Sequence, residues 1–460
     1  MHAMALILAA GQGTRMKSKL IKVLHPMLGV PMVMWPIQAA RKAGLKPCLV
    51  VGHQEDSVRA ALEGEDVLFA RQAVPRGTGD AVLCAFDVLP QEGSVLVCCG
   101  DTPLLRTKTL ADLLAAHKGT LATVLTAHIN EPASYGRIVR DSSGRVQEIV
   151  EASEATLEQL AITEINTGCY VFDIAWLRTV LPKFLPHQPK NEIYLTDAIA
   201  HAAQEERVGA VVLQDFEECQ GVNDRWALAQ ATEILQERII QQHALNGVTF
   251  DAPKSNHVDA QVVISSEVHI ERGVVLKGKT SIGTETQVQV CSVIEDSHIG
   301  SHVQILPHCH VVQTVIKDAV QVGPFARLRE GTVLEENCRI GNFVETKKTT
   351  MAQGSKANHL SYIGDASIGA DVNIGAGTIT CNYDGFNKSQ TIIEKGAFIG
   401  SNTALVAPVR IGEGAIVGAG STITKDVMSD SIAIGRSLQK NVEGAAPRFR
   451  ARAQFKKEQS

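Results

Sequence analysis

The second half of the chain places an aliphatic residue at every sixth position. The period holds at Ile264, Ile270, Leu276, Ile282, Val288 and Ile294, at Val322, Leu328, Leu334 and Ile340, at Ile368 and Ile374, and at Ile399, Leu405, Ile411, Val417 and Ile423. Neither an α-helix nor a flat strand buries a period of six on one face. A short strand and a tight turn, repeated three times per coil, give this period. The pattern therefore predicts a parallel β-helix with a shared aliphatic interior.

The six-residue period is interrupted twice, between Thr346 and Tyr362 and between Thr380 and Ile399. Interruptions in a repeat structure map to loops on one face, often the binding face. We therefore expect two protruding loops, the first ending in a segment that contains His359.

The first half has a different pattern, in which short apolar runs alternate with helical stretches. This alternation is typical of an α/β sheet. Strands are expected at Ala5–Ala9, Pro47–Val51, Val67–Ala70, Ser94–Cys98, Ala122–His128 and Cys169–Phe172, and helices at Met32–Ala43 and Asp56–Leu62.

A long helix joins the two patterns. Leu228, Ala231, Leu235 and Ile239 have helical spacing, and Asn246-Gly247 provides a stop signal. The sequence thus predicts an α/β domain over 1–224, a linker helix over 225–247, a β-helix over 248–442 and a basic tail over 443–460. The tail carries Arg448, Arg450, Arg452, Lys456 and Lys457. It is either a solvated terminus or a segment that reaches a neighbouring subunit.

Composition narrows the class of protein. The net charge of −5 argues against a general nucleic-acid binder. The 10 cysteines form no C-x-x-C pair, which favours reduced thiols in a cytosol over a disulfide framework or a zinc site. The apolar start of the chain is too short to cross a membrane and lacks the features of a signal peptide. We expect a cytoplasmic protein that binds neither membranes nor nucleic acid.

The first candidate site follows the first strand, in Leu8-Ala9-Ala10-Gly11-Gln12-Gly13-Thr14-Arg15. Small residues let backbone N–H groups close around phosphate oxygens. Arg15 and Lys22 place two cations beside them. The segment lacks the lysine motif of a P-loop and the third glycine of a dinucleotide-binding turn.

A carboxylate, Asp101, follows the buried strand Ser94–Cys98. Open α/β sheets bind ligands beyond the carboxyl ends of their parallel strands. Mg²⁺ commonly takes one or two protein ligands and completes its shell with phosphate oxygens. Taken alone, Asp101 could equally be a turn residue.

Together these motifs resemble those of the sugar-nucleotide pyrophosphorylases. The hexapeptide period narrows the resemblance to the bifunctional family of N-acetylglucosamine-1-phosphate uridylyltransferases and glucosamine-1-phosphate acetyltransferases, over Leu6 to about Arg436. The resemblance implies a Rossmann-like mixed sheet joined by a long helix to a left-handed β-helix. It also implies a homotrimer with acetyl-transfer sites between subunits.

For the α/β domain, the resemblance implies contacts with UTP or the UDP-sugar at Leu8, Ala9, Ala10, Gly11, Arg15, Lys22, Gln72, Gly77, Thr78, Cys99, Gly100, Asp101, Gly136, Glu151, Asn166 and Asn223. Gln72 would contact the uracil, and Asp101 and Asn223 would bind Mg²⁺. The chain departs from the family pattern twice. Ile21 replaces a usual proline, which would alter loop rigidity, and Cys99 replaces an aromatic residue and would contact substrate only through its backbone.

For the β-helix, the candidate general base is His359, because histidine titrates near neutrality. For a loop histidine taken alone, a structural hydrogen bond is the commoner role. The resemblance implies sugar-phosphate contacts at Arg329, Lys347, Tyr362 and Asn373, and acetyl-CoA contacts at Ala376, Asn382, Tyr383, Ser401, Ala419 and Arg436. Small residues around Ala376 and Ala419 would leave a groove for the pantetheine arm.

The implied activity is synthesis of UDP-N-acetylglucosamine, a precursor of the bacterial cell envelope. Acetyl-CoA would acetylate glucosamine-1-phosphate, and UTP would then uridylylate the product with release of pyrophosphate. One alternative is a monofunctional nucleotidyltransferase whose β-helix is structural or regulatory. Another is an adenylyl- or guanylyltransferase, which Gln72 argues against.

Overall fold

The computed structural model describes residues 3–11, 13–188 and 191–459. The chain forms two compact units, Met1–Ile239 and Ile240–Ser460. Among the described residues, no helix combines the length and apolar character needed to cross a membrane.

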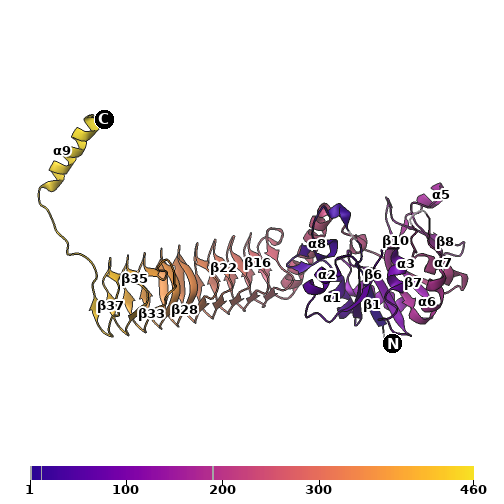
Figure 1. Ribbon diagram of the computed structural model, residues 1–460, viewed down its shortest axis with the longest axis horizontal. Coiled ribbons are helices and arrows are strands. Elements are labelled where there is room, and N and C mark those ends of the chain that lie inside the picture. The colour runs from indigo at the N-terminus through magenta and orange to yellow at the C-terminus, as the bar shows by residue number, and fades with distance from the viewer. Residues whose placement is uncertain (1–2, 12, 189–190, 460) are drawn as a thin grey trace. The chain divides into compact units, whose positions relative to one another are not determined.

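A mixed β-sheet forms the centre of the first unit (Figure 1). Its order is β11-β7-β10-β6-β1-β4-β5, with bounds Val208–Leu213, Ala122–His128, Glu164–Asp173, Ser94–Cys99, Ala3–Leu8, Lys46–Val51 and Leu68–Arg71. Strand β10 is antiparallel to β6 and β7, whereas the other neighbouring pairs in this order are parallel. A hairpin of β8 (Arg137–Arg140) and β9 (Val146–Val150) pairs with β10. The carboxyl ends of β1, β4, β5 and β6 and the amino end of β10 therefore share one edge.

Helices cover this sheet. Their bounds are Met34–Lys42 (α1), Glu55–Ala61 (α2), Thr78–Leu83 (α3), Thr107–Ala116 (α4), Leu157–Leu160 (α5), Ile174–Val180 (α6) and Asp197–Gln204 (α7). Helices α3, α6 and α7 bury alternate strand residues such as Leu6, Val50 and Val97. This alternation, and the near-continuous apolar runs of β4 and β6, are expected of strands buried on both faces. The predicted α/β architecture is confirmed.

The linker helix α8 spans Arg225–Leu245, as the helical spacing predicted. The first half of this helix packs against the first unit. Ala231 and Leu235 are buried in a cluster with Met27, Met32 and Leu104 of the first unit. This contact anchors the beginning of α8 beside the loop that follows β6.

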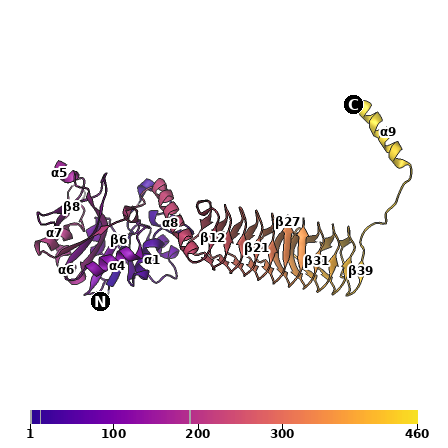
Figure 2. The same cartoon turned by 180° about the vertical axis from the view of Figure 1, so that it is seen from behind.

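The second unit is a left-handed parallel β-helix whose short strands run from β12 (Thr249–Phe250) to β39 (Ile432–Ala433). Figure 2 shows the ladder that includes β12, β21 (Gln304–Ile305), β27 (Arg339–Asn342), β31 (Asn373–Ile374) and β39. Residues in left-handed backbone conformation recur at the corners, for example Glu267, Glu285 and His302. Each aliphatic residue of the six-residue period is buried, which confirms the predicted interior.

The coils repeat every 17 or 18 residues. Where the sequence pattern lapses after Ile294, the interior continues through Ile299, Ile305, Val311 and Ile316 with two steps of five residues instead of six. A shortened corner thus shifts the sequence period without interrupting the stack.

The expectation of two protruding loops was wrong for the first. Residues 345–368 form β28 (Glu345–Met351), β29 (Lys356–His359) and β30 (Tyr362–Ile368), and β28 pairs with β30 in continuous register. Thr346 and Thr349 fill interior positions here. Their hydroxyls bond Thr332 at 3.0 Å and the Ile363 carbonyl at 2.9 Å, so the interior accepts them without an aliphatic residue.

The second expected loop is present. After β32 (Ile379–Cys381) the chain leaves the coil in a short hairpin closed by a Tyr383–Lys388 bridge, with Phe386 exposed. Beyond the last coil, the basic tail forms helix α9 (Ala445–Glu458), which buries no residue.

Candidate functional sites

The glycine-containing segment after β1 lies between the ends of two neighbouring strands. Ala9 N–H donates to the Val50 carbonyl and Gly100 N–H to the Leu8 carbonyl, both at 2.9 Å. A Cβ on Gly52 would lie 2.9 Å from the Ala10 carbonyl oxygen. Glycine is therefore required for this close approach, which brings the predicted residues Leu8, Ala9, Ala10 and Gly100 together.

Four of the predicted polar residues form one cluster at the same edge. The Lys22 ammonium pairs with the Asp101 carboxylate and donates to Asn223 Oδ1 at 3.2 Å. Arg15 Nη2 donates to the same Asn223 oxygen at 2.8 Å. The Val222 N–H donates to the Asp101 carbonyl at 2.8 Å, so the segment before α8 is attached to the loop after β6. Two cations thus share an oxygen-lined site beside the glycine-containing segment.

The donor set of this cluster fits Mg²⁺. A carboxylate oxygen of Asp101 and an amide oxygen of Asn223 converge on one cation, the Lys22 ammonium. Among the described residues, no group of three or more His, Cys, Asp or Glu side chains could hold a metal. Mg²⁺ needs no such group when phosphate oxygens complete its shell.

Ile21 and Cys99 are the two residues at which the chain departs from the family pattern. Ile21 precedes the short helix that carries Lys22 and has φ −58°, which lies within the range that proline imposes. Cys99 is the last residue of β6, and its carbonyl accepts from the Thr102 hydroxyl at 2.7 Å. Desolvation and the Asp101 carboxylate raise the pKa of the Cys99 thiol, so the thiol stays neutral at neutral pH.

A second group of predicted residues surrounds Gln72. Its Nε2 donates to Asp80 Oδ2 at 2.8 Å and to the Gly77 carbonyl at 3.1 Å. Asp80, which sequence reasoning missed, is itself buried and pairs with Arg76 at 3.2 Å. Because both amide hydrogens of Gln72 are engaged, its Oε1 remains the group that can accept from a ligand.

The loop that carries Gly77 and Thr78 is fixed to a distant segment. Gly79 N–H donates to the Ile193 carbonyl at 2.8 Å, and the Thr78 hydroxyl accepts from Leu195 N–H at 3.1 Å. Gly77 has φ +95°, and a Cβ there would lie 2.4 Å from the Ile193 carbonyl oxygen. Only glycine satisfies both constraints.

A cavity of about 600 Å³ lies beside Gln72 and the glycine-containing segment, and the cluster of Lys22, Asp101 and Asn223 is not among the residues that line it. Seven predicted residues contribute to it, namely Leu8, Ala10, Gly11, Gln72, Gly77, Thr78 and Glu151. Sequence reasoning missed Ser134, Glu192 and Tyr194, which also line it. The Tyr194 ring stacks on His187 at 4.4 Å, and a hydrogen bond to Asp197 raises the pKa of His187. Glu192 and Tyr194 reach the cavity from a segment in which no motif was recognised, whereas Ser134 lies just before the predicted Gly136.

Gly136, Glu151 and Asn166 lie at adjacent ends of β8, β9 and β10. The Asn166 N–H donates to the Gly136 carbonyl at 2.9 Å. Its side chain donates to the Tyr170 hydroxyl at 2.7 Å and accepts from Gly168 N–H at 3.0 Å. The structure brings these three predicted residues together, with the Asn166 amide largely engaged by protein partners.

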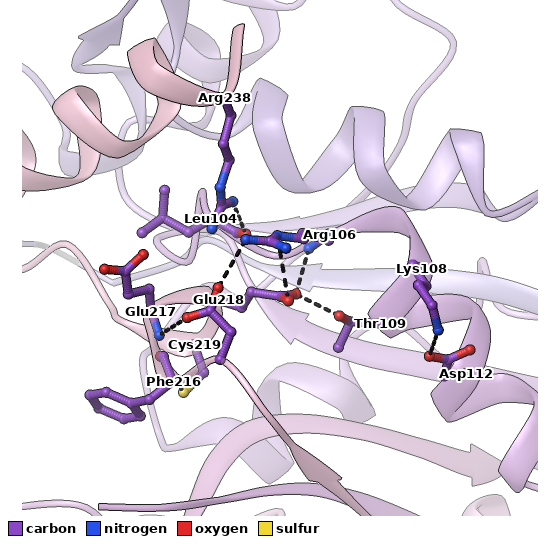
Figure 3. Close-up of polar contacts among 11 residues, drawn as sticks. Leu104, Arg106, Lys108, Thr109, Asp112, Phe216, Glu217, Glu218, Cys219 and Arg238 are labelled. Atoms are coloured by element: carbon purple, nitrogen blue, oxygen red, sulfur yellow. Dashed lines mark hydrogen bonds and ion pairs between the residues drawn. The ribbon is translucent and has the colours of Figure 1, made fainter. Parts of the chain in front are cut away.

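The loop that follows Asp101 is held by buried polar contacts (Figure 3). Glu218, only 4% exposed, accepts from the Arg106 N–H at 3.0 Å and from the Thr109 hydroxyl at 2.5 Å. Arg238 of α8 donates to the Leu104 carbonyl at 2.7 Å. Figure 3 shows these side chains converging from α4, α8 and the short helix at Phe216–Cys219. The position of the Asp101 loop thus depends on a carboxylate that does not itself line the cavity.

In the β-helix, His359 is an exposed residue at the end of β29. Its Nδ1 lies 2.9 Å from Oδ1 of Asn342, the residue directly paired with it on the preceding coil. Sequence reasoning missed Asn342, although its spacing of 17 residues from His359 is one coil length.

The predicted acetyl-CoA contacts continue the same column along the stack. Gly377 N–H donates to the His359 carbonyl at 3.3 Å, Asn402 N–H to Ala376 at 2.7 Å, and Gly420 N–H to Ser401 at 2.8 Å. Arg436 Nη1 donates to the Ala419 carbonyl at 2.5 Å. His359, Ala376, Ser401, Ala419 and Arg436 therefore follow one another on successive coils, and three of the five have small side chains.

The two basic residues that are predicted to bind the sugar phosphate each pair with a carboxylate. Arg329 bonds Glu345 at 2.9 Å, which raises the pKa of the Arg329 guanidinium, and Lys347 pairs with Glu330 at 3.3 Å. Tyr362 is the residue paired with Glu345 on the next coil. Asn373 lies on a different sheet, beneath Lys356.

The exposed hairpin contributes its two predicted residues unequally. Asn382 is buried and its amide donates to the Asp365 carboxylate, which ties the hairpin to the coil. Tyr383 is 59% exposed, and its hydroxyl donates to the Gly385 carbonyl at 2.5 Å.

Comparison with known families agrees with both halves of this description. Residues 5–163 match the model of the MobA-like NTP transferase domain, and residues 390–425 match that of the bacterial transferase hexapeptide repeats. Fold and matches together define the class: a nucleotidyltransferase domain followed by a hexapeptide-repeat transferase domain.

Curated relatives match nearly the whole chain. The Bifunctional protein GlmU of Pelobacter propionicus is 48% identical over 96% of this chain and 97% of its own length. The GlmU proteins of an Exiguobacterium species and of Streptococcus thermophilus are 47% and 45% identical and cover 97% and 96% of this chain, at 100% and 97% of their own lengths. The chain belongs to the GlmU family.

The buried role of Glu218 gives the first prediction. Glu218→Ala leaves the Thr109 hydroxyl and the Arg106 N–H without their partner, which should lower the free energy of unfolding by about 1–3 kcal/mol. Uridylyl transfer should fall as the Asp101 loop loses its anchor, while acetyl transfer stays unchanged. Denaturant unfolding and separate activity assays measure both effects.

Asp112→Ala is the matched control, since its ion pair with Lys108 lies on the exposed surface of α4. It should change stability by about 0.5 kcal/mol or less. Equal effects of the two substitutions would contradict the anchoring role of Glu218.

Proposed function

We propose that the chain makes UDP-N-acetylglucosamine in two steps, one in each unit. The proposal is supported by 45–48% identity to bifunctional GlmU proteins that extends through both units. Each unit also brings its own polar residues together. The β-helix would transfer acetyl from acetyl-CoA to glucosamine-1-phosphate, and the first unit would transfer uridylyl from UTP to the acetylated product. The ten free cysteines support a cytoplasmic location.

In the first unit, the sugar phosphate would attack the α-phosphorus of UTP and release pyrophosphate. The protein contributes position and charge rather than a covalent intermediate. Backbone N–H groups of Ala10 and Gly11 would face the phosphates, with Arg15 and Lys22 neutralising charge. Asp101 and Asn223 would hold Mg²⁺, which supplies further charge neutralisation when bound.

Base selection would depend on Gln72. Its free Oε1 can accept a hydrogen bond from the N3–H of uracil, whereas the corresponding ring nitrogen of cytosine carries no hydrogen. Asp80 maintains this orientation, because a carboxylate accepts only from the amide nitrogen. Gly77 and Thr78 would contact the base beside it, with Cys99 and Gly100 at the strand end. Gly136, Glu151 and Asn166 would bind the sugar.

In the second unit, the amine of glucosamine-1-phosphate would attack the thioester carbonyl carbon. A C–N bond forms and the C–S bond breaks. His359 accepts the amine proton and returns it to the CoA thiolate as that group leaves, which restores the neutral imidazole. Arg329 and Lys347 would bind the phosphate, with Tyr362 and Asn373 on the sugar. Acetyl-CoA would lie along the column of Ala376, Ser401, Ala419 and Arg436, bordered by Asn382 and Tyr383. We propose a homotrimer formed through the β-helix.

A stepwise product assay tests the whole proposal. Purified protein receives glucosamine-1-phosphate and acetyl-CoA first, then UTP and Mg²⁺, and products are identified by mass spectrometry. We expect N-acetylglucosamine-1-phosphate after the first addition and UDP-N-acetylglucosamine after the second. No product after the first addition, with turnover when the acetylated sugar phosphate is supplied, would favour a structural β-helix.

Asp101→Ala should reduce uridylyl transfer by at least about 10²-fold, because it removes a main electrostatic stabiliser. Acetyl transfer should be unaffected, since its residues belong to the other unit. Both rates are measured on the same preparation. Uridylyl transfer within a few-fold of the unsubstituted protein would exclude a metal-binding role for Asp101.

His359→Ala should lower acetyl transfer by about 10²–10⁴-fold, the range expected for removal of a general base. Uridylyl transfer should be almost unchanged. A loss of both activities would instead indicate misfolding or failure to assemble.

A further inference from the structure

We propose that Asn342 is the positioning residue that fixes the tautomer and orientation of His359 for acetyl transfer. The inference rests on the proposed acetyltransferase function. It concerns a residue that does not itself touch substrate but determines which imidazole nitrogen is available to do so.

The hydrogen bond between the two side chains has a definite polarity. Asn342 Oδ1 carries no hydrogen and can only accept, so the Nδ1 that lies 2.9 Å away must be the protonated ring nitrogen. In a neutral imidazole, the other nitrogen, Nε2, then holds the free lone pair. His359 is exposed, so Nε2 can accept a proton from an incoming amine.

The backbone holds both partners rigidly. Asn342 and His359 are register partners in the β27–β29 ladder, and Leu360 N–H donates to the Asn342 carbonyl at 3.0 Å. The His359 carbonyl accepts from the Ser361 hydroxyl at 2.8 Å. Between the coils, a Cβ on Gly341 would lie 1.9 Å from the Asn358 carbonyl oxygen, so the two coils are too close here for any residue except glycine. Rigid elements of this kind give a functional side chain a precise position.

The same arrangement suits the reaction. As His359 takes the proton, positive charge develops on the imidazole, and the Nδ1–H donates more strongly to Asn342. In the opposite tautomer, Nε2 would carry a hydrogen and could not accept one from the amine. Loss of the orienting partner of a general-base histidine costs activity through this tautomer, as in the serine protease triad. Here an uncharged amide would perform the orienting role.

Three substitutions of Asn342 separate the acceptor from the size of the side chain. Asn342→Ala and Asn342→Leu remove the acceptor and should lower kcat for acetyl transfer by about 10–100-fold, with both KM values within about twofold. Asn342→Asp keeps an oxygen acceptor and should retain kcat within about threefold to fivefold of the unsubstituted protein. Gln353→Ala, an exposed residue on the neighbouring coil with backbone contacts only, is the control and should change nothing.

A double substitution shows whether Asn342 acts through His359. In the His359→Ala background, Asn342→Ala should cause no further loss, because residues that act as a unit are not additive. Uridylyl transfer, measured on every variant, should be unchanged and verifies that the first unit is folded, and the unchanged KM values for acetyl transfer verify that the second unit is folded. A retained kcat in Asn342→Ala and Asn342→Leu, an equal loss in Asn342→Asp, or an additional loss in the double variant would each overturn the inference. Absence of acetyl transfer in the unsubstituted protein would instead refute the proposed function.

Discussion

The parallel stacking of coils around a filled interior is the constraint on which the second unit depends. Each interior position must lie above its equivalent on the next coil, as Ile264, Ile282 and Ile299 do. Burying the apolar side chain at each position contributes about 1.5–3 kcal/mol of stability, and a change of register would lose this contribution. Residues that are one coil length apart in the sequence are therefore neighbours in space and can contact each other. Asn342 and His359 meet for this reason.

In the first unit, residues that are distant in the sequence meet at one edge of the sheet. Parallel strands end at one edge, so residues that follow different strands meet there without being close in sequence. Leu8 is the last residue of β1, and Gln72 and Asp101 follow β5 and β6, respectively. The antiparallel direction of β10 brings Asn166 to the same edge at the amino end of that strand. The half-buried Lys22 ammonium is paired with oxygen atoms from two further segments. A charge in such a position must be paired, and these partners satisfy it.

The sequence predicted the repeating interior positions of the β-helix and the site residues that directly follow a strand. It failed where the six-residue period changed locally. The six-residue period predicted the β-helix because burial enforces it. The expected loop at Thr346–Tyr362 was wrong, because Thr346 occupies an interior position with its hydroxyl bonded to that of Thr332. Met351, Ala357 and Ile363 then continue the buried interior. The five-residue steps that end at Ile299 and Ile316 were not predicted, since a corner can lose one residue without altering the stack. Tyr194 was missed in the cavity because no spacing connects it to the motifs, and Ser134 was missed although it lies just before the predicted Gly136.

The residues that sequence reasoning missed most consistently are those that orient a predicted residue. Asp80 directs the amide of Gln72, Asn342 directs the imidazole of His359, and Glu218 holds the loop after Asp101. Asp80 and Asn342 are each one hydrogen bond from a predicted residue, whereas Glu218 acts through the loop that follows Asp101. Each depends on a partner that only the folded chain supplies. A side chain with several rotamers has a defined donor or acceptor only when such a partner removes the alternatives. The residue types of a site therefore suggest its chemistry, but the partners behind them determine which atom performs it.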